Sequence, residues 1–373
     1  MNSISWRIYT ASASSRLAKF LRGFDIRVFA LLSCALNSIA FSQSTIMSWG
    51  DNSYGQCDTP AGKFNRISAG GYHNVGLRSD GVVICWGRND YGQCDVPVLP
   101  SQVVVAIAAG GFHTSCIARV GVNGTLVCWG RNDSGQSTCG QTISLGETTG
   151  LSAGWAHNLV LENYGAVYGV GDNTYGQSSY ESHFHGAAAG GWHNVGHGNP
   201  GYFAYSWGLN NFGQAGLNVN YNTTDVAAGL LHTAWLRGDE IIMFGNNDYG
   251  QCSVPETERF SNQQAVLGGY HTISKKYGGS WVAWGRNDYG QCDIPLTPTG
   301  KFVQVSAGLL HTVALRPPCK ADIDESLDVD GGDLARVLLD CGPCLNCDSD
   351  LDGDGLVSSS DIGLVLIDWG QCD

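Results

Sequence analysis

The sequence repeats itself about every forty residues, and this periodicity restricts the fold more than any other feature. One anchor has the pattern WGxNxxGQ and begins at Trp49, Trp86, Trp129, Val170, Trp207, Phe244 and Trp284. Successive copies are 37, 43, 41, 37, 37 and 40 residues apart. Units of this length cannot bury their apolar faces alone, so they stack into a solenoid or close into a propeller.

A second anchor alternates with the first. It is a turn of small residues followed by a histidine, and its seven copies end at His73, His113, His157, His193, His232, His271 and His311. Two short apolar runs separated by a turn such as Ser79-Asp80-Gly81 follow the histidine, which is a β-hairpin signal. A shorter run before the histidine adds a strand. Each repeat is therefore predicted to be an antiparallel sheet of three or four strands.

The order of the anchors favours a ring over an open stack. Residues 43–50 form a lone strand ending in Trp-Gly, and the last repeat, which ends near Leu315, lacks its Trp-Gly strand. Pairing the two would complete a seventh sheet and remove both exposed edges. We therefore expect residues 43–318 to be all-β, a seven-bladed β-propeller closed by the N-terminal strand.

The two anchors resemble repeats of the regulator of chromosome condensation family, and the resemblance covers about three quarters of the chain. Members of this family form seven-bladed propellers. The resemblance implies either nucleotide exchange on a nuclear partner or, as in secreted relatives, a protein-binding platform. This chain has no basic tail, which disfavours the exchange-factor alternative.

Residues 1–42 have the layout of a signal peptide. Basic residues up to Arg27 precede an apolar run over residues 28–41 and the small-residue stretch Ala40-Phe41-Ser42. That run is shorter than the ~20 residues needed to span a bilayer, and no later segment is apolar enough to do so. We expect a secreted or cell-surface protein.

Charge and cysteines refine this expectation. The net charge is -13, most of it in residues 319–373, and nucleic acid is not an expected partner because no basic field is present. Export favours disulfides among the 14 cysteines. Cys57, Cys94, Cys252 and Cys292 recur at one repeat position and are interpreted as small buried apolar residues.

The acidic C-terminal segment, residues 319–373, predicts a calcium site. Asp350, Asp352, Asp354 and Asp361 stand at positions 1, 3, 5 and 12 of a loop with Gly355 at position 6, which is a Ca²⁺ pattern. Leu356 would contribute its carbonyl, and Ser358 would act through water.

An imperfect copy lies 28 residues upstream, with oxygen-bearing side chains at Asp322, Asp324, Ser326, Asp330 and Asp333 and with Leu327 where glycine is expected. We expect a weaker site there. Each loop precedes a segment with apolar residues at helical spacing. The duplicated units resemble a dockerin domain, which implies a small α-helical module, Ca²⁺ as cofactor and a cohesin-like partner. The CGPCLNC stretch has zinc-ribbon spacing, but no second matching pair exists, so disulfides are favoured.

One loop position carries an aromatic residue in six of the seven repeats: Tyr54, Tyr91, Tyr175, Phe212, Tyr249 and Tyr289. In three repeats an arginine follows Trp-Gly: Arg88, Arg131 and Arg286. These residues are the candidate ligand face. The alternative is that each aromatic ring packs beneath its own loop.

We interpret the seven repeated histidines as structural groups that satisfy backbone atoms between blades. His183, His185 and His197 fall outside the repeat pattern and are either surface-loop residues or the acid–base groups of an enzyme. No nucleophile, phosphate-loop or dinucleotide motif is present. The leading hypothesis is an exported, non-enzymatic binding protein, and the main alternative is a carbohydrate-active lyase or hydrolase.

Overall fold

The computed structural model describes residues 45–99, 103–120, 123–140, 142–144, 150–179, 181, 183–198, 203–220, 223–295, 302–316, 321, 323, 328–329, 331–343, 348–351, 356–367 and 370–371. The chain divides into residues 1–41 and 42–373, and only the second unit contains described residues. The predicted signal peptide therefore lies outside the described residues. Of the helices described, none has the length and apolarity to cross a bilayer.

Between residues 45 and 316, the described chain is arranged as seven antiparallel sheets of three or four strands. The first two are β2 (Phe64–Ala69), β3 (His73–Arg78) and β4 (Val83–Gly87), then β5 (Val103–Ala109), β6 (His113–Val120), β7 (Asn123–Gly130) and β8 (Thr142–Ser144). The next two are β9 (Gly150–Ala153), β10 (His157–Leu161) and β11 (Val167–Gly171), then β12 (Gly186–Ala189), β13 (His193–His197), β14 (Ala204–Gly208) and β15 (Asn218–Val219). The fifth and sixth are β16 (Thr223–Ala228), β17 (His232–Arg237) and β18 (Glu240–Gly245), then β19 (Asn262–Leu267), β20 (His271–Lys276) and β21 (Trp281–Gly285). The predicted blades of three or four antiparallel strands are confirmed.

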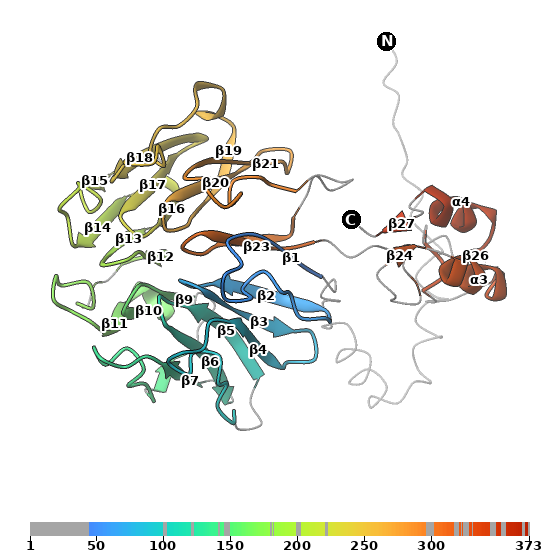
Figure 1. Cartoon of the computed structure of the whole chain (residues 1–373), viewed down its shortest axis with the longest axis horizontal. Helices are drawn as coiled ribbons and strands as arrows, with labels where there is room; N and C mark the ends of the chain where they lie inside the picture. Colours follow the sequence, from blue (N-terminus) through green and yellow to red (C-terminus); the bar gives the residue numbers. More distant parts are fainter. Residues whose placement is uncertain are drawn as a thin grey trace, which may run out of the picture. The chain divides into compact units, whose positions relative to one another are not determined.

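The seventh sheet joins the two ends of this region. It contains β22 (Gln304–Ala307), β23 (His311–Leu315) and β1 (Ile46–Gly50), and β1 pairs antiparallel with β23. Figure 1 shows the sheets arranged around a common centre. The apolar side chains of this sheet share one core with those of the first: Phe64 is fully buried against Ile46 and Leu315.

Each repeated histidine donates a hydrogen bond to the following sheet. The Nε2 atoms of His73, His193, His232 and His271 lie 2.8, 2.8, 3.2 and 3.1 Å from the hydroxyls of Thr114, Thr233, Thr272 and Thr312. Those of His113, His157 and His311 lie 3.1, 2.7 and 2.8 Å from Oδ1 of Asn158, Asn194 and Asn74. Because the last of these bonds returns to the first sheet, the seven bonds form a circuit. The acceptors of these bonds are side chains one residue beyond the next histidine, and His73, His113, His193 and His232 also have a backbone hydrogen bond with the next repeated histidine, in line with the expected backbone partners.

The acceptors fix which imidazole nitrogen donates. Asn158 uses its amide nitrogen to donate to the Gln136 carbonyl at 2.8 Å, so its Oδ1 must accept from His113 Nε2. Thr114 likewise donates its hydroxyl proton to the Gln93 carbonyl. Nε2 of each imidazole therefore carries a proton, and the neutral state follows from burial. Burial lowers the pKa of His73 to about 3 and that of His113 to about 4.

Glycines before the histidines let the sheets meet at the axis. A Cβ on Gly70 would lie 2.4 Å from the carbonyl oxygen of Gly110, and one on Gly308 would lie 2.6 Å from that of Gly70. The inner strands line an axial cavity of about 430 Å³, and the Ala-Gly turns form a narrower pocket of about 80 Å³.

Two short 3₁₀ helices, Asn163–Gly165 and Glu256–Glu258, interrupt the loops.

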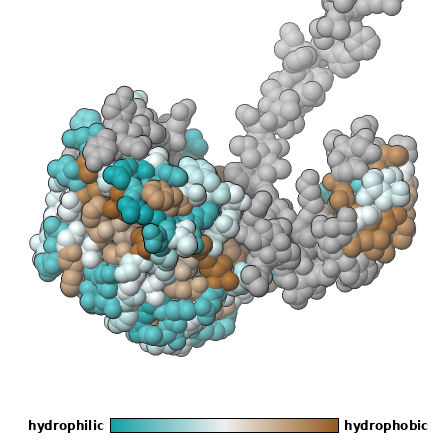
Figure 2. Space-filling model, turned by 90° about the horizontal axis from the view of Figure 1, so that it is seen from above, coloured by the Kyte–Doolittle hydropathy of each residue, from teal (hydrophilic) through white to brown (hydrophobic). Residues whose placement is uncertain are grey.

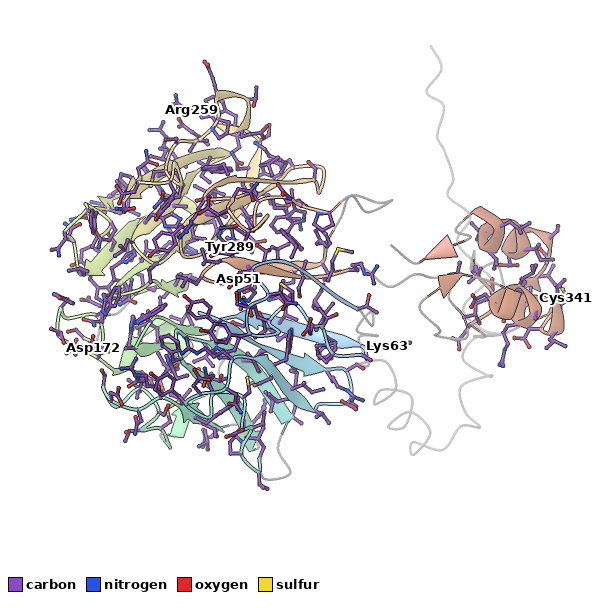
Figure 3. The ribbon with its side chains drawn as sticks, in the orientation of Figure 1. Asp51, Lys63, Asp172, Arg259, Tyr289 and Cys341 are labelled. Carbon is purple, nitrogen blue, oxygen red and sulfur yellow. A yellow bond between two sulfur atoms is a disulfide. The ribbon has the colours of Figure 1, made fainter. Side chains whose placement is uncertain are left out.

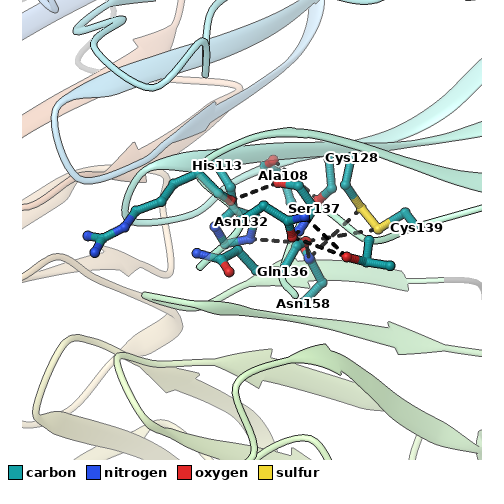
Figure 4. The surroundings of a disulfide bond; sticks show 11 residues. Ala108, His113, Cys128, Asn132, Gln136, Ser137, Cys139 and Asn158 are labelled. Carbon is teal, nitrogen blue, oxygen red and sulfur yellow. Dashed lines mark hydrogen bonds between the residues drawn. A yellow bond between two sulfur atoms is a disulfide. The ribbon is translucent and has the colours of Figure 1, made fainter. Parts of the chain in front are cut away.

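One disulfide is present among the described residues and links Cys128 in β7 to Cys139, with a Cα–Cα distance of 5.6 Å (Figure 4). The repeated cysteines are partly buried, and burial raises the pKa of Cys94 to about 12, but their thiols also donate hydrogen bonds, which the apolar interpretation did not include. Cys94 Sγ donates a hydrogen bond to the Arg88 carbonyl. In the next repeat the Ser137 hydroxyl makes the equivalent bond to the Arg131 carbonyl.

Among the residues described beyond 316 there are two α-helices, α3 (Gly331–Leu339) and α4 (Ser359–Ile367), which begin 28 residues apart. Short strands link the copies reciprocally: β24 (Asp328–Val329) pairs with β27 (Gly370–Gln371), and β25 (Gly342–Pro343) pairs with β26 (Leu356–Val357). The two strand pairs are related by the same 28-residue shift, so the duplication seen in the sequence is an internal pseudo-symmetry of the described residues.

The buried histidine circuit predicts strong acid sensitivity. Folding lowers the imidazole pKa values, so the unfolded chain binds more protons below about pH 6.5, and stability is lost as the pH falls from there toward 4. Each imidazole contributes up to about 1.4 kcal/mol per pH unit. Burial raises the pKa of Asp225 to about 6, which acts in the opposite sense but involves one group against seven. Urea unfolding at pH 7.5, 6.5 and 5.5 should show a steep decrease only below pH 6.5. A free energy of unfolding that is the same at pH 7.5, 6.5 and 5.5 would contradict the neutral circuit.

The disulfide predicts a second stability change. A disulfide between residues 11 positions apart stabilises the folded protein by about 2 to 3 kcal/mol. The double variant Cys128→Ser, Cys139→Ser should therefore have a free energy of unfolding lower by that amount. Dithiothreitol should have little further effect on the double variant. An equal effect of the reductant on wild type and variant would show that this bridge does not form.

Candidate functional site

The loops after each Trp-Gly are held by one glutamine. In the loop of residues 88–95, Gln93 is fully buried, and its carbonyl accepts hydrogen bonds from Trp129 Nε1 at 2.9 Å and Thr114 Oγ1 at 2.8 Å. Its Oε1 accepts the backbone N–H of Tyr91 at 2.9 Å. The preceding Gly87 has φ +100°, and a Cβ at this position would lie 2.7 Å from the carbonyl oxygen of Tyr72. This frame fixes the backbone beneath Tyr91 and leaves its ring at the surface.

The predicted loop aromatics are partly exposed. Tyr54, Tyr91, Tyr175, Phe212, Tyr249 and Tyr289 are 44 to 50% exposed. Three of them contact an aromatic residue of a histidine turn: Tyr54 lies 5.4 Å from Tyr72, Tyr91 lies 5.5 Å from Phe112, and Tyr249 lies 5.1 Å from Tyr270. The loops and the histidine turns therefore lie on one side of the sheets, which we call the loop face. Figure 3 labels Asp51 and Tyr289, two residues of these loops.

The predicted arginines lie over the predicted tyrosines. The guanidinium carbons of Arg88, Arg131 and Arg286 are 4.6, 5.1 and 4.7 Å from the ring centres of Tyr54, Tyr91 and Tyr249, each of which belongs to the preceding repeat. Cation–π attraction of this kind contributes about 0.5–2 kcal/mol. Sequence position alone places these residues in separate repeats, and the fold brings them together.

Each of these arginines also binds an aspartate two residues later. The Arg88–Asp90, Arg131–Asp133 and Arg286–Asp288 pairs have N–O distances of 2.6 Å, and the aspartates are the more exposed partners, at 56, 66 and 61%. The loop face therefore presents carboxylates and tyrosine rings outward, while the guanidinium groups lie between rings. The Asp288 hydrogen bond raises the pKa of Arg286.

The sequence reasoning missed the inner half of this face. Tyr72, Phe112, Trp155 and Trp192 belong to the histidine turns and form a chain of ring contacts with centroid distances of 6.2, 5.2 and 6.0 Å. The signal was present, because Tyr72, Phe112, Trp192 and Tyr270 directly precede a repeated histidine and Trp155 stands two residues before His157. With Tyr54 and Tyr91 these four rings form a continuous surface, which we call the aromatic arc. On the face that Figure 2 shows, hydrophobic and hydrophilic residues are intermixed.

The three additional histidines lie on one blade. His185 and His197 are adjacent, because the His185 backbone N–H donates to the His197 carbonyl at 2.7 Å, and burial lowers the pKa of His197. His183 is exposed and has φ +77°. Across the described residues, no group of three metal-binding side chains is found. These histidines are separate from the aromatic arc.

The predicted calcium ligands are only partly described. Asp322, Asp324, Ser326, Asp330, Asp352 and Asp354 lie outside the described residues. Asp333 and Asp361, at position 12 of the two loops, are fully buried. Asp333 Oδ1 accepts the N–H of Ile323, and Asp361 Oδ1 accepts that of Leu351, the same position in each loop. Two buried carboxylates that face their loops fit a cation there. Asp361 also caps α4, since its Oδ2 accepts the Ser358 N–H at 2.8 Å.

Three comparisons place this fold among known proteins. The family model of the regulator of chromosome condensation (RCC1) repeat matches residues 64–93 and 149–177. No curated protein matches the sequence. Prp20p from Saccharomyces cerevisiae, described with its binding to Gsp1p and histones, is 17% identical with a TM-score of 0.58, covering 74% of this chain and 92% of its own. Human WBSCR16 is 16% identical with a TM-score of 0.58, covering 74% of this chain and 99% of its own. At these identities the similarity shows the fold, a β-propeller of this repeat type.

Proposed function

We propose that this chain is an exported, non-enzymatic binding protein of the regulator of chromosome condensation type, in which a closed seven-bladed propeller presents its loop face to a protein partner. The aromatic arc carries this proposal. Tyrosine, tryptophan and arginine are the side chains enriched in protein-binding hot spots, because they offer large rigid surfaces. Here the fold holds six aromatic rings together at the loop face, with Tyr54 and Tyr91 44 and 45% exposed and the other four partly buried.

The histidine circuit and the β1–β23 pairing support closure of the ring. The Cys128–Cys139 disulfide supports the proposed export, since such bridges persist mainly in oxidising compartments. The carbohydrate-active enzyme remains the alternative, and His183, His185 and His197 would be its candidate groups. The arc makes binding the better-supported function.

A pull-down experiment tests the aromatic arc: the full chain is immobilised, and the proteins that it retains from surface extracts are identified. Tyr91→Ala with Phe112→Ala removes two central rings, and the retained partner should be lost at least ten-fold. Tyr277→Ala is the matched control, because Tyr277 is 60% exposed at the opposite end of its blade, after β20. A partner that both variants retain equally would refute the loop face as the binding surface.

For the C-terminal segment we propose a dockerin-like module that docks to a cohesin-like protein when Ca²⁺ is bound. Asp350, Asp361 and the Leu356 carbonyl would hold the ion in the second loop, with Asp333 in the first. A bound Ca²⁺ would neutralise the loop carboxylates and fix each loop against its helix. Figure 2 shows hydrophobic residues on the described part of this segment, where Leu338 and Leu366 are 54 and 55% exposed and occupy equivalent positions.

Calorimetric titration of the full chain tests the calcium sites. Ca²⁺ should bind at one stronger and one weaker site, and Asp350→Ala should weaken the stronger site at least ten-fold while Asp95→Asn, in the propeller, changes nothing. Absence of binding heat, or equal affinity in the Asp350→Ala variant, would refute the module. Helical circular dichroism establishes that the variant is folded.

A further inference from the structure

We infer that the axial cavity of the propeller binds a small organic anion with a polyhydroxylated body, a sugar acid or a sugar phosphate, through the guanidinium of Arg66. This inference goes beyond the proposed function, because the cavity is lined by the inner strands and not by the loop face. It follows from comparing one position of the inner strand in all seven sheets.

The position pairs with the residue four places after each repeated histidine. In the β2–β3 pair Arg66 faces Leu77, and in the β22–β23 pair Gln304 faces Leu315. The fifth and sixth sheets have Asp225 and Gln264 there. The second, third and fourth sheets have little or no side chain at this position, with Ala106, Gly150 and Gly186. The seven residues therefore start from equivalent points but differ greatly in size and charge.

A side chain at this position can close on the next sheet. Gln304 does so with both ends of its amide: Oε1 accepts the Ile67 N–H at 3.1 Å, and Nε2 donates to the Ile67 carbonyl at 2.8 Å. Asp225 likewise accepts the N–H of Ala265 in the sheet after its own, at 3.4 Å. Arginine has no acceptor atom. Arg66 therefore cannot accept a backbone N–H of the second sheet as these two side chains do in theirs.

Arg66 is left as a cation without a partner in the chain. Of the described residues that line the cavity, it is the single charged one. It forms no ion pair or side-chain hydrogen bond with any described residue. By contrast, six other arginines of the propeller bind a carboxylate: Arg78, Arg88, Arg131, Arg237, Arg259 and Arg286. A carboxylate or phosphate in the cavity would supply the pairing that the chain gives to these others.

The cavity has room for a ligand on the side where Arg66 lies. Ala106 and Gly150, in the next two sheets, line it together with Arg66 and Gln304. Because these two residues are small, no side chain of the second or third sheet fills the space at this level. The whole cavity measures about 430 Å³, which lies within the range of small-molecule sites in proteins.

Three serine hydroxyls give the cavity further hydrogen-bond donors. Ser68, Ser152 and Ser306 stand two residues after the compared position of their strands and line the cavity. Each Oγ accepts the backbone N–H of an alanine in the next sheet, at 2.9 to 3.1 Å, and no described residue accepts its proton.

The inner strands add backbone groups of both kinds. Each inner strand is the edge of its sheet, so its outward N–H and C=O groups have no further strand to pair with. Sugar hydroxyls can both donate and accept hydrogen bonds. A hydroxylated anion therefore matches this lining better than a bare inorganic ion, because its acidic group meets Arg66 and its hydroxyls meet the serines and the strand edges.

Calorimetric titration of the full chain with four hexose derivatives of similar size tests the site. At least one of glucuronate and glucose 6-phosphate should bind, and the tighter of the two identifies a carboxylate or a phosphate ligand. Neutral glucose and cationic glucosamine should bind at least ten-fold more weakly.

Three variants locate the site. Arg66→Gln introduces the side chain that the seventh sheet has at this position, so the ring should still close, and anion binding should weaken at least ten-fold. Gly150→Gln should fill the cavity and weaken binding at least five-fold; a Cβ there would lie 3.5 Å from its nearest neighbour. Arg78→Gln removes a cation of the same sheet that is already paired with Asp80, and it should change affinity less than two-fold. Circular dichroism establishes that each variant is folded.

Failure of wild type to bind either anion would overturn the site, and so would binding of glucose as tight as that of the anions. Equal weakening by Arg66→Gln and Arg78→Gln would also overturn it, because only the overall charge would then matter. The proposed function fails separately, since the Arg66→Gln chain should retain the same protein partner as wild type in the pull-down experiment.

Discussion

The hydrogen bond from each histidine to the next sheet is the constraint on which the rest of this structure depends. A sheet of three or four short strands is marginally stable alone, and its inner strand is an unpaired edge. The imidazole is fully buried and must donate to a side chain that only the following sheet supplies, as from His311 to Asn74. One repeat cannot satisfy this requirement by itself, so stability comes from the complete set of neighbours.

The same bonds position the surface. The threonine or asparagine that accepts from a histidine also donates to a glutamine carbonyl, and that glutamine holds the loop behind the outer tyrosine. Loop and histidine turn therefore reach the surface at a fixed separation, and a ring from each lies in contact. The aromatic arc is a consequence of how the interior is bonded, and contacts within the chain hold its rings in place.

Much of this architecture was predictable because the same pattern of anchor residues recurs seven times in the sequence. The hairpins, the blade composition and the unpaired first strand all follow from the spacing of Trp-Gly and histidine. The stacking of Arg88 on Tyr54 did not follow, because those residues belong to different repeats and meet only in three dimensions. Tyr72 and Trp192 were missed for another reason: they adjoin the buried histidines and were interpreted with them. The pairing of Cys128 with Cys139 depends on a loop conformation that spacing does not determine.

Cross-linking the first strand to the last sheet tests ring closure most directly. Ser48 faces Val313 in the β1–β23 pair, so a Ser48→Cys, Val313→Cys chain should form that bridge on mild oxidation, as identified by peptide mapping. Val195 is the equivalent residue of the fourth sheet, and a Ser48→Cys, Val195→Cys chain should not form a bridge between these positions. Bridging to position 195 as readily as to 313, or no bridge at 313, would contradict a ring closed by the first strand.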